Sequence, residues 1–202
     1  MKTYPAIALI EYSSIATGIL AGDAMLKKAP ITVIKSGTVH NGKYLVLIGG
    51  SVGSVEESYA KGLAIDPDNI IDSMILPNVH EQLHDSILGL RLKCTKESLG
   101  IIEASSVSTM IKASDAGVKS ADVNIVEIRL ADDIGGKSFT IYNGSIEEIQ
   151  AAVEVAKNAI TLSEHWVNET IIPNLHADLK IQIDQTTKFA QVKLGKVADS
   201  EV

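Results

Sequence analysis

The chain has 202 residues, of which 46% are hydrophobic and 21% are charged, enough to bury one core in each of two small domains. Its 18 basic and 25 acidic residues give a net charge of −7 without a run of Lys or Arg, which argues against nucleic acid and membrane as partners. The single cysteine, Cys94, excludes a disulfide framework within the chain. No apolar stretch is long enough to span a bilayer, and Met1–Pro5 lacks the features of a signal peptide. We therefore expect a folded cytoplasmic protein.

The sequence contains two copies of one unit. The segment I-E-Y-S-S-I-A-T-G-I-L-A-G-D-A-M-L-K near the start returns as I-E-A-S-S-V-S-T-M-I-K-A-S-D-A-G-V-K. Three pairs of counterparts lie 92 positions apart: Glu11 and Glu103, Asp23 and Asp115, and Lys27 and Lys119. The offset grows to 94 at Gly42 and to 96 at His80, as expected for a tandem duplication with short loop insertions. Two copies in one chain favour a pseudosymmetric assembly.

Each copy is expected to form a strand, a helix, a hairpin, a second helix and a final strand. In the first copy the apolar run 6–12 predicts a strand, and Ser14 can cap a helix whose apolar residues recur at helical spacing from Ile15. Runs 31–39 and 43–48 predict a hairpin. Capping boxes at 54–57 and 145–148 predict the second helix of each copy. A final strand over 69–79 and a short helix over 80–88 complete the first copy.

The remaining segments connect or follow the copies. The charged stretch 91–97 predicts a linker, and Leu179, Ile181 and Ile183 alternate as in an added strand. We predict a first domain over 1–90, a second over 97–180 and a C-terminal tail over 181–202.

The repeated motifs resemble the bacterial microcompartment shell domain. The resemblance rests on the segment around Glu11 quoted above, on G-K-Y-L-V-L-I-G-G-S-V-G-S-V-E-E-S and on I-L-P-N-V-H, and it spans Ala6–His176. The order of the motifs is similar to the unpermuted, trimer-forming tandem class of the propanediol-utilisation type. The resemblance implies an α/β fold, an α+β sandwich in which each domain has an antiparallel-containing sheet with flanking helices.

The same resemblance implies a structural protein and not an enzyme. Three chains would form a flat pseudohexameric disc that tiles with other shell proteins around encapsulated enzymes. A pore on the threefold axis would pass small metabolites, metal or electrons. Two hairpin loops would line it, and the predicted pore residues are Val39, His40, Asn41, Gly42, Asp132, Asp133, Ile134, Gly135 and Gly136.

His40 carries a further implication. It lies where iron–sulfur-carrying members of the family have cysteine, and three imidazoles around an axis can bind a metal or form a pH-sensitive ring. An iron–sulfur cluster is not expected, because thiolates are its usual ligands and Cys94 lies in the linker. Apart from a metal at His40, the sequence predicts no cofactor.

Four residues are candidates for contacts between discs: Lys27, Lys119, Asn78 and Asn174. In the family the lysine lies across the edge between neighbouring discs. Each lysine here also follows an Asp by four positions, and an ordinary i, i+4 ion pair on a solvated helix face is the alternative. Many members of the family have arginine where this chain has the two asparagines.

The segment H-E-Q-L-H at positions 80–84 leaves an enzymatic alternative open. It matches H-E-x-x-H, in which two histidines bind zinc and the glutamate acts as a base. His80 recurs as His176, whereas Glu81 and His84 have no counterpart, so we favour a structural role. After the shell protein, the second hypothesis is a metal-binding or redox-relay protein at the shell boundary, and the third is a zinc hydrolase.

Overall fold

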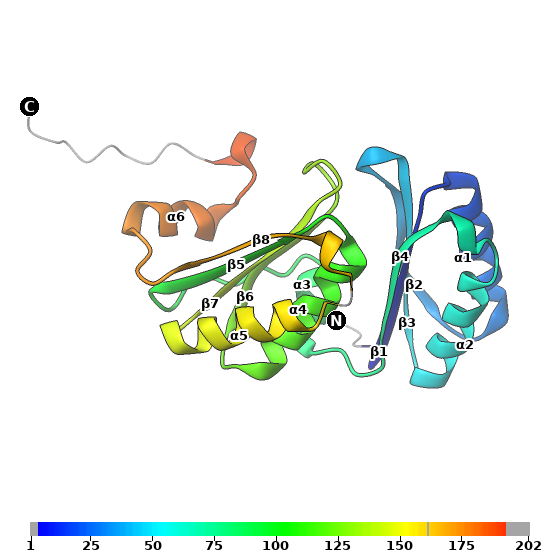
Figure 1. Ribbon diagram of the computed structural model, residues 1–202, viewed down its shortest axis with the longest axis horizontal. Coiled ribbons are helices and arrows are strands. Elements are labelled where there is room, and N and C mark those ends of the chain that lie inside the picture. Colours follow the sequence, from blue (N-terminus) through cyan, green and yellow to red (C-terminus); the bar gives the residue numbers. More distant parts are fainter. Residues whose placement is uncertain (1–3, 161, 193–202) are drawn as a thin grey trace, which may run out of the picture.

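The fold contains two similar halves (Figure 1), seen in a computed structural model that describes residues 4–160 and 162–192. The first sheet contains β1 (Ala6–Tyr12), β2 (Thr32–Val39), β3 (Lys43–Gly50) and β4 (Ile70–Leu76), in the order β2-β3-β1-β4. The second contains β5 (Ser98–Ala104), β6 (Asn124–Leu130), β7 (Ser138–Gly144) and β8 (Trp166–Ile172), in the order β6-β7-β5-β8. Neighbouring strands are antiparallel in both sheets.

The two sheets match in register as well as in order. Glu11 pairs with Asp72 across β1 and β4, and its counterpart Glu103 pairs with Asn168 across β5 and β8. In both sheets the register shifts directly after this glutamate. The duplication therefore extends to the backbone irregularities.

Two long helices cover one face of each sheet. They are α1 (Ile15–Lys28) and α2 (Val52–Leu63) in the first repeat, and α4 (Val107–Ser120) and α5 (Ile146–Asn158) in the second. Ser14 and Ser106 cap α1 and α4 by accepting from the N–H groups of Thr17 and Thr109. A Cβ at Gly18 would lie 2.4 Å from the Tyr44 ring, so the small residues of α1 allow close packing on the sheet.

A shorter helix follows the last strand of each repeat. The first is α3 (Glu81–Ile87) and the second is α6 (Ala177–Gln185). The prediction of a strand at Leu179, Ile181 and Ile183 was therefore wrong. Alternation over three positions is too short to distinguish a strand from a helix, and Leu179 and Ile183 are also spaced by one helical turn. The predicted domain boundaries remain predictions, with position 180 falling inside α6.

The N-terminus of α2 also differs from the prediction. Ser51 caps this helix and accepts from the N–H of Ser54, so the predicted cap at Ser54 already lies inside the first turn. In the second repeat Ser145 is the cap, as predicted, and accepts from the N–H of Glu148. The Glu148 carboxylate accepts instead from the N–H of Asp122, so the reciprocal half of the capping box is replaced by a contact with the α4–β6 loop.

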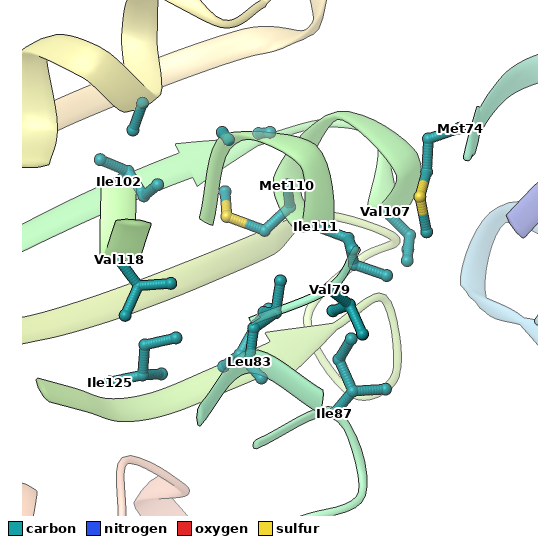
Figure 2. Packing of buried hydrophobic residues seen from close by; sticks show 14 of the residues in the cluster. Met74, Val79, Leu83, Ile87, Ile102, Val107, Met110, Ile111, Val118 and Ile125 are labelled. Atoms are coloured by element: carbon teal, nitrogen blue, oxygen red, sulfur yellow. The ribbon is translucent and has the colours of Figure 1, made fainter. Parts of the chain in front are cut away.

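The two repeats share one apolar core. The largest buried cluster contains Leu9 and Leu47 of the first sheet together with residues of α4 and the second sheet. Figure 2 shows Met74 beside Val107, and Val79 near Ile111, so the end of the first repeat packs directly on α4. α3 lies in this junction, where it contacts both α4 and β6. Among the described residues, no helix combines the length and hydrophobicity needed to cross a membrane.

Candidate pore and edge sites

The two predicted pore loops lie side by side in one chain. The first is the turn His40–Gly42 between β2 and β3, and the second spans 131–137 between β6 and β7. The N–H of Asp133 donates to His40 Nδ1 at 3.2 Å, and Asn41 Nδ2 donates to the carbonyl of Gly135 at 2.9 Å. Both hairpin tips lie at the top of Figure 1, where the two halves face each other. The structure thus brings predicted pore residues from both repeats together.

Several residues of these loops have positive φ angles. In the first loop they are Asn41 and Gly42, with φ values of 68° and 70°, and in the second they are Ala131, Asp133, Gly135 and Gly136. Asn, Asp and Gly adopt this left-handed region at low cost, whereas Ala does so rarely. Ala131 is buried, its N–H donates to the carbonyl of Lys137 at 2.9 Å, and its carbonyl accepts from Gly136. These bonds hold the longer loop in a conformation unlike that of the first.

The loops present polar groups of both signs. His40, Asp132 and Asp133 are exposed, and the Asp133 carboxylate lies 3.6 Å from Lys188 Nζ. Ile134 is half-buried. A passage lined by these loops would therefore suit small polar molecules better than apolar ones.

The geometry of His40 does not fit a metal ligand acting through Nε2. A ligating histidine donates its second ring N–H to an acceptor. Here Nδ1 faces the N–H donor of Asp133, so Nδ1 holds the lone pair and the ring proton lies on Nε2. Over residues 4–160 and 162–192 of one chain, no group of three His, Cys, Asp or Glu side chains could hold a metal ion.

Cys94 offers no alternative ligand in this conformation. The thiol is buried, and the N–H of Cys94 donates to Asp184 Oδ1 at 2.7 Å. Burial, reinforced by the Asp184 carboxylate, raises the pKa of the thiol to about 12. The thiolate that an iron–sulfur cluster requires is thus disfavoured.

The residues of H-E-Q-L-H do not converge on one cavity. His80 has ψ of 137° and lies at the N-cap of α3, outside the helix, and its N–H donates to Asp115 Oδ1 at 2.9 Å. Glu81 is exposed, whereas His84 is 1% exposed and places Nδ1 3.1 Å from Asp85 Oδ1. His80 therefore links the first repeat to α4 of the second. The motif lacks the zinc-binding arrangement, in which two histidines on one face of a helix both bind the metal.

The two edge lysines have different surroundings. Lys27 forms the i, i+4 pair with Asp23 at 2.6 Å, and both side chains are more than half exposed. Lys119 contacts the buried carboxylate of Asp115 and the carbonyl of Asn78. The structure thus joins Lys119 to Asn78. Both lysines form the i, i+4 ion pair, but only the pair of Lys27 lies on a solvated face, and the edge contacts remain a prediction. Asn174 lies between β8 and α6 in the chain. These two elements belong to the half on the left of Figure 1, whereas α1 lies on the right.

The junction between the repeats contains a site that the sequence analysis left without a role. Glu11 is fully buried, and its carboxylate accepts from Ser106 Oγ at 2.8 Å and from the N–H of Ser108 at 2.7 Å. Asp72 accepts from Thr109 Oγ1 at 2.8 Å. Both acids lie at the N-terminus of α4, where the helix dipole and free N–H groups favour negative charge. A glutamate recurring inside two apolar strands was the available signal.

Two α/β sandwiches with the same strand order lie in one chain, their corresponding loops meet, and the first packs on α4 of the second. These features define a tandem-domain protein. The BMC domain matches the chain twice, over residues 6–79 and 98–175. The chain therefore belongs to the BMC-domain family of bacterial microcompartment shell proteins.

Known members of the family resemble the whole chain or half of it. The chain is 36% identical over 174 residues to the bacterial microcompartment shell protein PduT of Citrobacter freundii, covering 86% of this chain and 95% of the relative. The shell protein EutM of Salmonella typhimurium is 32% identical over 84 residues, 42% of this chain and 85% of EutM. A crystal structure of a microcompartment protein from Desulfitobacterium hafniense superposes with a TM-score of 0.77 at 37% identity, covering 87% and 98% of the two chains.

Proposed function

We propose that three chains close into a pseudohexameric disc that tiles the microcompartment shell and leaves a central opening for small polar metabolites. The disc would contact other shell proteins at its rim and encapsulated enzymes on one face. The chain itself would have no catalytic role.

The observation that carries this proposal is the packing of the first repeat on helix α4 of the second. The first repeat covers the N-terminus and one face of α4 through Glu11, Val79 and Leu83. If the same contact relates the second repeat to the first repeat of another chain, the interface is heterologous and can close into a ring. We infer a ring of six domains, which is three chains. EutM matches 42% of this chain over 85% of its own length, so it corresponds to a single repeat, which is the unit of this ring.

The joined loops support the position of the opening. Each chain places His40 and Asn41 against the loop of Asp133 and Gly135. Threefold repetition would surround an axis with three such pairs, each carrying one imidazole and exposed carboxylates of Asp132 and Asp133. Because Nδ1 of His40 faces a donor, passage of metabolites is better supported than a bound metal or an electron relay.

Native mass spectrometry tests the assembly directly. We expect a species of three times the 21.5 kDa chain mass at micromolar concentration, and electron microscopy should show sheets built from discs. A stable monomer or dimer would contradict the proposal. Iron or zinc at one ion per trimer, lost in His40→Ala, would instead favour the metal-binding function.

A further inference from the structure

One face of α1 is exposed although its counterpart on α4 is buried. Ile15, Ile19 and Leu26 are 42%, 55% and 50% exposed. Their counterparts 92 positions later are Val107, Ile111 and Val118, which are 1%, 0% and 4% exposed. The face of α4 is covered by β1, β4 and α3 of the first repeat. The apolar stripe Ile15–Ile19–Leu26 therefore has the composition of a buried junction without its partner.

The two counterpart glutamates, Glu11 and Glu103, also differ in burial. Glu11 is 0% exposed because it lies on the N-terminus of α4, whereas the Glu103 side chain is 32% exposed. Lys137 Nζ donates to the Glu103 carboxylate at 2.8 Å. Lys137 is the counterpart of Lys43, which lies 3.5 Å from Glu11 and donates to the carbonyl of Ser105. The second repeat thus has the same Glu–Lys pair, but no helix N-terminus in the described part of this chain covers its glutamate.

The end of each repeat shows the same pattern. Leu83 of α3 is fully buried in the junction, and its counterpart Leu179 of α6 is 46% exposed. The N–H of His80 donates to Asp115, which is 6% exposed, whereas the counterpart carboxylate of Asp23 is 54% exposed. The junction within the chain therefore buries the glutamate, the apolar helix face and the aspartate. Their counterparts, Glu103, the stripe on α1 and Asp23, are exposed to solvent.

We propose that Glu103 of one chain seats on the N-terminus of α1 of the neighbouring chain and is the main polar contact that closes the ring. Its carboxylate would accept from Ser14 Oγ and from the N–H of Ala16, the counterparts of Ser106 and Ser108. The stripe Ile15–Ile19–Leu26 would be covered by the same neighbour, including Leu179 of α6. The occupant of this surface is a second copy of this chain, so the inference rests on the proposed trimer.

The contact between chains would carry one acid fewer than the junction within a chain. Asp72, which accepts from Thr109, has Asn168 as its counterpart in the strand register. Thr17, the counterpart of Thr109, donates instead to Asp66 of its own repeat at 3.2 Å. Because Asp66 satisfies Thr17 within the chain, only Glu103 must come from outside. The sequence difference at Asn168 therefore supports a single incoming carboxylate.

Glu103→Gln and its matched control Glu11→Gln test the contact. Hydrogen bonds to a charged group are worth more than those to a neutral amide, so we expect Glu103→Gln to raise the dissociation constant of the trimer by about 10- to 100-fold. Glu11→Gln should lower the thermal stability of the chain without a comparable change in trimer dissociation. Both are measured by sedimentation velocity across a dilution series, with circular dichroism as the check on folding.

A second matched pair tests the apolar stripe. Ile19→Lys should abolish trimers because the counterpart Ile111 is fully buried. Leu20→Lys should leave the trimer intact, because position 20 corresponds to Lys112, which is exposed. A wild-type trimer whose dissociation is unchanged by both Glu103→Gln and Ile19→Lys would overturn this inference and leave the proposed function standing. A wild-type monomer would overturn the proposed function itself.

Discussion

The buried carboxylate of Glu11 makes a quantitative prediction about the junction within the chain. Glu11→Ala removes the acceptor for the N–H of Ser108 and one of two acceptors for Ser106 Oγ, which also contacts the Asp72 carboxylate. Ser106 and Ser108 are both buried. Hydrogen bonds to a charged group contribute about 1.5–3 kcal/mol each. Because Asp72 remains as an acceptor for Ser106 Oγ, only the bond from Ser108 is lost without a replacement, and the expected destabilisation is about 1.5–3 kcal/mol.

This free energy converts into a measurable shift in melting temperature. Unfolding entropy is about 2.1 cal/mol/K per residue, or about 0.4 kcal/mol/K for a chain of 202 residues. The expected decrease in Tm is therefore about 4–7 °C. Differential scanning calorimetry measures it, with wild type and variant at one protein concentration because assembly makes Tm depend on concentration.

Glu81→Ala is the matched control for Glu11→Ala. Glu81 is an exposed acid on α3, and substitutions of such residues change stability by at most about 0.5 kcal/mol. The reasoning about the junction would be refuted if Glu11→Ala lowered Tm no more than Glu81→Ala does.

Three further predictions concern the rim, the loops and the thiol. Lys27→Glu should prevent growth of sheets in electron micrographs while leaving Tm nearly unchanged, because its ion pair is exposed; Lys119→Glu should also lower Tm, because Lys119 contacts the buried Asp115. His40→Ala should remove the acceptor of the Asp133 N–H, seen as faster exchange of that amide than in the wild type. Cys94 should resist iodoacetamide at pH 8 until the protein unfolds, because burial raises the pKa of its thiol to about 12.

Each of these has a contradicting result. Normal sheets formed by Lys27→Glu would remove this residue from the rim contacts. An Asp133 amide that exchanges equally fast in wild type and His40→Ala would show that the two loops are apart in solution. Rapid alkylation of native Cys94 would show that the linker opens.

Much of the fold could be predicted because local signals were repeated. The strand over 6–12 and the helix from Ile15 recur in the second copy with their serine caps, and two agreeing patterns are stronger than one. The prediction of a strand near the end of the chain was wrong for the opposite reason, because its local signal was ambiguous. The apolar residues Leu179 and Ile183 fit both a strand and a helix, and the choice was decided by the Pro-Asn-Leu-His turn before α6, which matches the turn before α3.

The candidate sites were harder to predict because they depend on contacts between repeats. Family resemblance predicted that both hairpin loops line a pore, which stays a prediction. It did not predict the bond between His40 and Asp133, which joins residues 93 positions apart. The role of Glu11 depends on a helix that begins almost a hundred residues later, at Val107. Sequence periodicity describes one element at a time, so it identified the repeated glutamate without identifying its partner.

The shared core between the repeats has a consequence for how quickly a ring can form. Because the linker tethers the second repeat to the first, that junction forms at a high effective concentration and does not require a collision between molecules. Separate domains would have to meet repeatedly by diffusion, and every intermediate would expose two unfinished faces. Fusing two domains in one chain halves the number of polypeptides that a ring would need. Fewer partial rings would then compete for free chains. Gene fusion here would act as a kinetic device for assembly, in addition to allowing the two loops to diverge.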